Sequence, residues 1–117
     1  MEFLTLEDIV EINKKVGEGG TLVRKGDLEF VLDKVSMSKD VMKAATNLLY
    51  DMIHAHAFLN GNKRTAFQAM RAFLVLNGKT LTHNESNEKT IERLLYDIAQ
   101  SKISKSKVEK ILKKMIK

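Results

Sequence analysis

The segment from Asn62 to Leu76 carries apolar side chains on nearly every face and contains neither glycine nor proline. Its helical period predicts a helix that is stable only when other elements surround it, because an uncovered face would leave hydrocarbon in water. The apolar positions are Ala66, Phe67, Ala69, Met70, Phe73 and Leu74. We therefore expect a central buried helix with the rest of the chain packed around it.

The segments on either side also carry apolar residues at helical spacing, which predicts further helices rather than strands. These stripes fall in residues 9–16, 28–35, 41–56, 91–99 and 108–116. Four of them follow side chains that can accept a hydrogen bond from a helix N-terminus. The expected caps are Thr5 with Asp8, then Asp27, Ser38, and Ser104 or Ser106.

The residues from Gly20 to Lys25 break this helical pattern. The run Thr21-Leu22-Val23 predicts a short strand or hairpin arm before the next turn. The expected fold class is therefore all-α, a compact bundle of about six helices with one irregular or β segment near residues 18–27.

A chain of 117 residues, 44% of them apolar, is expected to form one domain over residues 1–117. The absence of cysteine excludes disulfides, thiolate zinc sites and cysteine nucleophiles. The longest uninterrupted apolar run, Ala72–Leu76, is far shorter than a membrane span, and the first residues do not resemble a signal peptide. We expect a soluble, cytoplasmic protein without a membrane partner.

The net charge of +5 is concentrated near the C-terminal end, where residues 102–117 contain seven lysines and one acid, Glu109. Such a segment is either a solvated helix face or a surface for nucleic-acid phosphates. We favour the solvated face and do not expect nucleic acid as a partner. A non-enzymatic module that binds nucleic acid through this basic end is the alternative.

The residues between the two longest predicted helices, 56–66, carry most of the functional information. The dipeptide Asn60-Gly61 predicts a tight turn, after which the buried helix begins. The first N–H groups of that helix lack helical partners and carry the positive end of its dipole. Lys63 and Arg64 add two cations at this unfavourable place, which indicates an anionic ligand, with phosphate as the natural candidate.

His56 ends the preceding apolar stripe, so we expect its ring to overhang the anion site while the core holds it. An imidazole beside a bound phosphate is placed to accept a proton from an incoming hydroxyl. Phe58 is expected to point into the core and anchor the loop. A histidine on an apolar stripe, an Asn-Gly turn and a Lys-Arg pair are each common structural features, and only their combined order and spacing indicate a site.

This string resembles the signature of the Fic/Doc family, His-x-Phe-x-(Asp/Glu)-Gly-Asn-(Gly/Lys)-Arg. The matching positions are His56, Phe58, Gly61, Asn62, Lys63 and Arg64. Lys63, followed by Arg-Thr-Ala, is similar to the Doc (death-on-curing) branch. Enzymes of the family that transfer AMP usually have glycine there and a further arginine where this chain has Phe67.

The resemblance implies a toxin of a toxin–antitoxin system that inhibits translation. Its activity would be that of a protein kinase, moving the terminal phosphoryl group of ATP or another nucleoside triphosphate onto a threonine or serine hydroxyl. The implied target is translation elongation factor Tu. The alternatives are a Fic-type adenylyltransferase and a catalytically silent Fic-fold binding protein.

The resemblance also implies a role for each matching residue. His56 would be the general base. Lys63 and Arg64 would hold the phosphates and neutralise charge in the transition state. Gly61 would let the backbone approach a phosphate, and Asn62 would bind phosphate through its backbone N–H and orient it with its side chain.

The segment Thr21-Leu22-Val23 matches, by position only, the flap with which the family aligns its target. The flap does so by adding a strand to the target peptide. We therefore expect this segment to contact the acceptor protein.

Asn60 stands where the family has the Asp or Glu that binds Mg²⁺. An amide oxygen can ligate a hard cation but lacks the charge of a carboxylate, so we expect weaker recruitment of Mg²⁺ and attenuated or absent activity. Three explanations fit Asn60. It is a tolerated natural variant whose metal is held by the nucleotide, or it marks a catalytically silent protein, or it is an introduced substitution.

Some family members carry an inhibitory helix with the pattern Ser/Thr-x-x-x-Glu-(Gly/Asn). Glu18 is the one glutamate here that is followed by glycine or asparagine, and Lys14 stands four residues before it. No inhibitory helix is therefore expected, and restraint of a toxin would come from a separate antitoxin chain that folds onto the bundle.

Overall fold

The computed structural model describes residues 1–116, which contain six α-helices. In chain order they are α1 (Leu6–Lys15), α2 (Lys25–Ser36), α3 (Val41–Ala55), α4 (Asn62–Leu76), α5 (Glu88–Ala99) and α6 (Lys105–Met115). The all-α fold class predicted from the sequence is confirmed. The last lysine of the basic end, Lys117, lies outside the described residues. Within residues 1–116, no helix has both the length and the apolar character needed to cross a bilayer.

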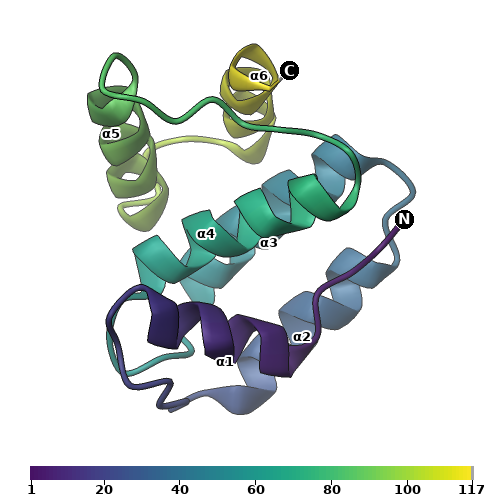
Figure 1. Cartoon of the computed structure of the whole chain (residues 1–117), viewed down its shortest axis with the longest axis vertical. Coiled ribbons are helices and arrows are strands. Elements are labelled where there is room, and N and C mark those ends of the chain that lie inside the picture. Colours follow the sequence, from purple (N-terminus) through teal and green to yellow (C-terminus); the bar gives the residue numbers. More distant parts are fainter. Residues whose placement is uncertain (117) are drawn as a thin grey trace.

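Helices α3 and α4 lie side by side at the centre of the molecule (Figure 1). On one side of this pair, α2 packs on α3 and α1 packs on α4. On the other side, α5 and α6 pack against α3, and α5 also contacts α4. The interior position predicted for α4 is confirmed, and α3 shares that position because it contacts α2, α4, α5 and α6.

The central pair is packed through small side chains. Ala44 and Ala45 of α3 and Ala66 and Ala69 of α4 are completely buried. Small residues let neighbouring helix backbones approach closely, and larger apolar side chains fill the space around them at close to crystal density. The loop that joins α3 to α4 is thus attached at both ends to the buried centre of the fold.

Two of the predicted caps are confirmed. Thr5 accepts a hydrogen bond from the Asp8 N–H at 3.1 Å, and the Asp8 carboxylate accepts one from the Thr5 N–H, which completes a capping box. Ser104 caps α6 by accepting from the Lys107 N–H at 3.2 Å, so Ser106 lies inside the helix.

The other two predicted caps are wrong. Helix α2 begins at Lys25 without a side-chain cap, so Asp27 lies in its first turn. Helix α3 is capped by Asp40 rather than Ser38, because Asp40 directly precedes the helix and its carboxylate accepts from the Lys43 N–H at 2.9 Å. That hydrogen bond holds the pKa of the Asp40 carboxyl below its ordinary value.

The predicted strand near residues 21–23 is reduced to a single antiparallel bridge between Leu22 and Phe58. The Val23 N–H donates to the Ala57 carbonyl at 2.8 Å, and the Leu59 N–H donates to the Thr21 carbonyl at 3.0 Å. This segment therefore pairs with the α3–α4 loop, which it supports along one edge.

Candidate functional site

His56 is the residue at which α3 ends, and it adopts the left-handed conformation with φ 50° and ψ 45°. Glycine adopts this conformation freely, and asparagine, aspartate and histidine adopt it more often than other residues. The side chain is exposed, so the expectation that the core holds the ring is wrong. The backbone is held instead by Arg24, whose guanidinium donates to the His56 carbonyl at 3.0 Å.

Phe58 and Asn62 close the loop between α3 and α4. Phe58 is only 2% exposed and belongs to the core, as expected. The Asn62 side-chain oxygen accepts from the Phe58 N–H, and its side-chain nitrogen donates to the Phe58 carbonyl, both at 2.9 Å. Both polar atoms of this buried side chain are engaged within the loop, so the expectation that it also orients a phosphate stays a prediction. The backbone N–H of Asn62 is the group at this position that remains for a phosphate contact.

The N-terminus of α4 is open to an anion. Gly61 precedes the helix with φ 73° and contributes no side-chain cap, and the first turn contains no acid. Lys63 and Arg64 in that turn are exposed. A Cβ atom at position 61 would lie 2.6 Å from the Cγ atom of Glu18, so only glycine fits here without displacement. The free N–H groups and the two cations therefore lie together on one part of the surface, which suits an anion.

A cleft of ≈ 410 Å³ opens above this loop. Its lining is formed by Ile53, His56, Leu59, Asn60, Gly61, Asn62, Lys63, Arg64, Ala99 and Gln100. The predicted base, metal ligand and phosphate-binding residues thus surround one cavity. The predicted flap does not line it. Ala99 and Gln100 were missed by sequence reasoning, because no local pattern in α5 places its end beside a loop more than thirty residues earlier.

Glu18 is a further residue that the sequence did not assign to the site. Its carboxylate lies 2.6 Å from the Arg64 guanidinium, and its side chain passes over Gly61. The sequence feature that could have identified Glu18 is its place between two glycines, because a turn there can bring the acid back over the loop. A carboxylate in this place shows that the guanidinium accepts an anion, and a bound phosphate would compete with it.

Asn13 of α1 joins the separate parts of the site and is only 1% exposed. Its side-chain nitrogen donates to the Asn60 carbonyl at 3.1 Å and to the Thr65 hydroxyl at 2.9 Å. Its side-chain oxygen accepts from the Gly20 N–H at 2.8 Å. The signal in the sequence was a polar residue on the apolar stripe of α1, and buried polar residues are satisfied by specific partners.

We expect Asn13→Ala to lower the free energy of unfolding by about 2–4 kcal/mol, because it leaves buried donors and acceptors without partners. Urea denaturation measures this loss. Asn84 is an exposed asparagine with local hydrogen bonds only, and Asn84→Ala is the matched control, with an expected loss below about 1 kcal/mol. Equal losses in the two variants would contradict the role of Asn13.

The residues at position 60 and around it fit a divalent cation poorly. Asn60 offers a neutral amide oxygen, and the nearby carboxylate of Glu18 is paired with Arg64. Within residues 1–116, no group of three or more His, Asp or Glu side chains could hold a metal ion. Hard cations such as Mg²⁺ bind through carboxylates and substrate phosphates, so we derive no catalytic step through a metal here.

Comparison with known families points to one of them. The model described as Fic/DOC family matches residues 3–74, more than half of the chain. This range runs from the residues before α1 to near the end of α4, and it includes the whole α3–α4 loop. No curated protein matches the chain.

Proposed function

Because the chain belongs to the Fic/DOC family, we propose that it transfers the terminal phosphoryl group of ATP or another nucleoside triphosphate to a threonine or serine hydroxyl of a protein. Members of this family are usually transferases that use a nucleoside triphosphate with a divalent metal. The observation that carries the proposal is the cleft shared by His56 and the cationic N-terminus of α4.

The α4 end of the cleft is the phosphate site. The uncapped N–H groups after Gly61 can donate to a bound anion, and Lys63 and Arg64 add full charges beside them. The N–H groups are already in place before the ligand binds, so little reorganisation of the backbone accompanies the development of charge on the transferred phosphoryl group. Lys63 and Arg64 therefore stabilise a loose transition state whose charge is spread over the equatorial oxygens.

His56 is the general base. As the acceptor oxygen bonds to the γ-phosphorus, the bond from that phosphorus to the bridging β–γ oxygen breaks and the nucleoside diphosphate leaves. The proton of the hydroxyl passes to an imidazole nitrogen of His56. An exposed ring at the wall of the cleft is open to a hydroxyl carried by another protein.

Transfer of AMP is the second candidate, and Phe67 argues against it. Its ring is 4% exposed and packs edge-on against His83, with 5.2 Å between ring centroids. A buried ring replaces the further arginine that AMP-transferring relatives use one turn into this helix. Incubation with α- and γ-labelled ATP separates the two reactions. The γ-label should appear on the acceptor, and retention of the α-label there would establish adenylylation.

We propose elongation factor Tu as the acceptor, a death-on-curing toxin as the biological role, and the cytoplasm as the location. Proteins of this family often pair with an antitoxin, and a separate antitoxin chain would restrain this one. The proposed flap, Thr21-Leu22-Val23, already pairs with the α3–α4 loop on one edge. A target strand would therefore add to the opposite edge, where the backbone groups of Leu22 point.

Asn60→Asp should increase the affinity for Mn²⁺ or Mg²⁺ in the presence of nucleotide by at least about tenfold. A unit charge at about 4 Å contributes on the order of several kcal/mol at an effective dielectric of 20, and water and phosphates compensate for part of it. Electron paramagnetic resonance of bound Mn²⁺ measures this without requiring turnover. Equal affinity in the two proteins would show that the nucleotide alone holds the metal.

A further inference from the structure

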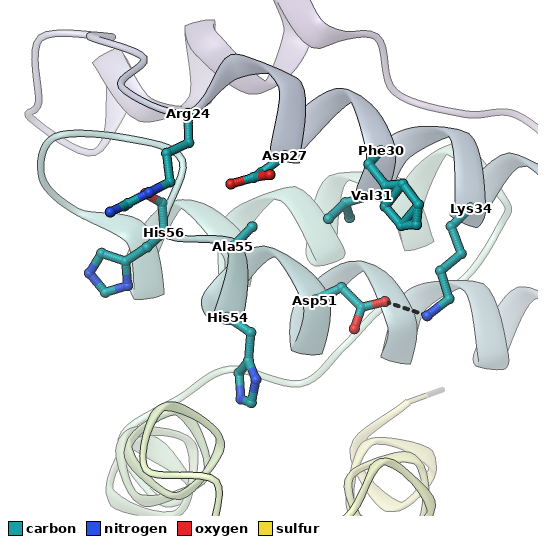
Figure 2. A pocket seen from close by; sticks show the side chains of 9 residues that line it. All are labelled: Arg24, Asp27, Phe30, Val31, Lys34, Asp51, His54, Ala55 and His56. Atoms are coloured by element: carbon teal, nitrogen blue, oxygen red, sulfur yellow. Dashed lines mark hydrogen bonds and ion pairs between the residues drawn. The ribbon is translucent and has the colours of Figure 1, made fainter.

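An open groove of ≈ 650 Å³ lies between α2 and α3. Arg24 and His56 stand at one end of it, and Lys34 and Asp51 stand at the other (Figure 2). From Arg24 to Lys34 the groove follows about 15 Å of α2, at about 1.5 Å per residue. Its volume lies within the range of about 300–1,000 Å³ that is usual for ligand sites.

The groove adjoins the phosphate cleft at His56, which lines both. At its other wall the cleft shares Lys63 and Arg64 with a hollow between α4 and α5. That hollow and the groove have no lining residue in common. The cleft therefore lies between them, with the imidazole on the side of the groove and the two cations on the side of the hollow.

In an in-line transfer, the attacking oxygen and the leaving group lie on opposite sides of the phosphorus. The leaving nucleoside diphosphate is held by the cations, so it lies on the side of Lys63 and Arg64. The acceptor hydroxyl must then approach on the side of His56, which is the side of the α2–α3 groove.

The lining of the groove suits a polypeptide. Phe30 is 67% exposed and offers an aromatic face to an apolar side chain, with Val31 beside it (Figure 2). At the far end, the Lys34 ammonium lies 3.3 Å from the Asp51 carboxylate. The Lys105 ammonium approaches the same carboxylate at 2.9 Å. Two ammonium groups share this one carboxylate, so the far end carries one net positive charge and both cations are already engaged in ion pairs.

We propose that this groove binds the acceptor protein as an extended segment, with its hydroxyl at His56 and an apolar side chain on Phe30. The inference rests on the proposed phosphoryl transfer. The six residues from Arg24 to Phe30 span about 9 Å of helix. An extended chain covers this distance in about three residues. The acceptor hydroxyl and the apolar side chain are therefore about three residues apart.

A library of eight-residue peptides with one central threonine, incubated with the whole chain and γ-labelled ATP, tests this. We expect labelled peptides to be enriched about tenfold in an apolar residue three positions from the threonine, the selectivity of a modest apolar pocket. Phe30→Ser should abolish this enrichment. Met37→Ser is the matched control, because Met37 is 77% exposed at the end of the same helix, outside the groove, and this variant should keep the enrichment.

The affinity for ATP should be the same in all three proteins within about twofold. Enrichment that survives Phe30→Ser overturns the proposal, and so does a loss of ATP affinity in that variant, which would assign the groove to the nucleotide. If the wild-type chain labels no peptide, labelling of elongation factor Tu decides whether the proposed transfer itself fails. Binding of the same peptides to the immobilised chain then tests the groove as a peptide site, independently of transfer. Retention that depends on Phe30 supports the proposal, and equal or absent retention overturns it.

Discussion

His56→Asn lowers the rate of phosphoryl transfer by about 10²–10⁴-fold, the usual contribution of a general base. Nucleotide affinity stays within about twofold of wild type, because the phosphates are held by the N-terminus of α4 and by Lys63 and Arg64 rather than by the imidazole. Initial rates with γ-labelled ATP, together with equilibrium binding of the nucleotide, separate the two effects.

Asparagine is the informative substitution at this position because His56 has a φ of 50°. Asparagine tolerates the left-handed conformation, and alanine adopts it only with strain. His56→Asn should therefore keep the wild-type stability, whereas His56→Ala should lose both transfer and some stability. If either variant keeps full turnover, His56 is not the base, and if both lose ATP binding, the ring belongs to the nucleotide site.

Arg64→Ala weakens both nucleotide binding and turnover. A charge-assisted hydrogen bond contributes about 1.5–3 kcal/mol, and the 61% exposure of this side chain favours the lower end. We therefore expect about a tenfold loss of affinity and a further loss in rate, since the guanidinium also neutralises charge in the transition state. Titration of the variant with a nucleotide and single-turnover transfer measure the two losses.

Glu18→Gln should have the opposite effect on binding, because it removes the carboxylate that pairs with Arg64 at 2.6 Å. Arg93→Ala is the control for loss of charge, since Arg93 pairs with Asp97 on α5, away from the cleft. The proposed phosphate site requires affinity to rise in Glu18→Gln, fall in Arg64→Ala and stay constant in Arg93→Ala. The same affinity in all three variants would show that Arg64 does not hold a phosphate.

The helices could be predicted from the sequence because helical period is a local property. Thr5 was identified as a cap because Asp8 follows it at the spacing of a capping box. The cap of α3 could not be chosen in the same way, since Ser38 and Asp40 lie within one turn of each other. Asp40 is the cap because the helix begins directly after it.

The contiguous part of the site was predictable for a similar reason. His56 and the residues from Asn60 to Arg64 span the end of α3, the loop after it and the first turn of α4, and nine residues cannot separate far in space. The orientation of each side chain was less predictable. The ring of His56 is exposed rather than held by the core, and the side chain of Asn62 is used inside the loop.

The sequence by itself determined that six helical segments form, that α4 lies in the interior and that the loop before it gathers cations at a helix N-terminus. These outcomes depend on residues close together in the chain. Only the tertiary structure brought Asn13, Glu18 and Arg24 to that loop and placed the α2–α3 groove beside the cleft at His56. Those contacts depend on how α1 and α2 pack against the central pair, and packing between distant segments leaves no periodic signal in the sequence.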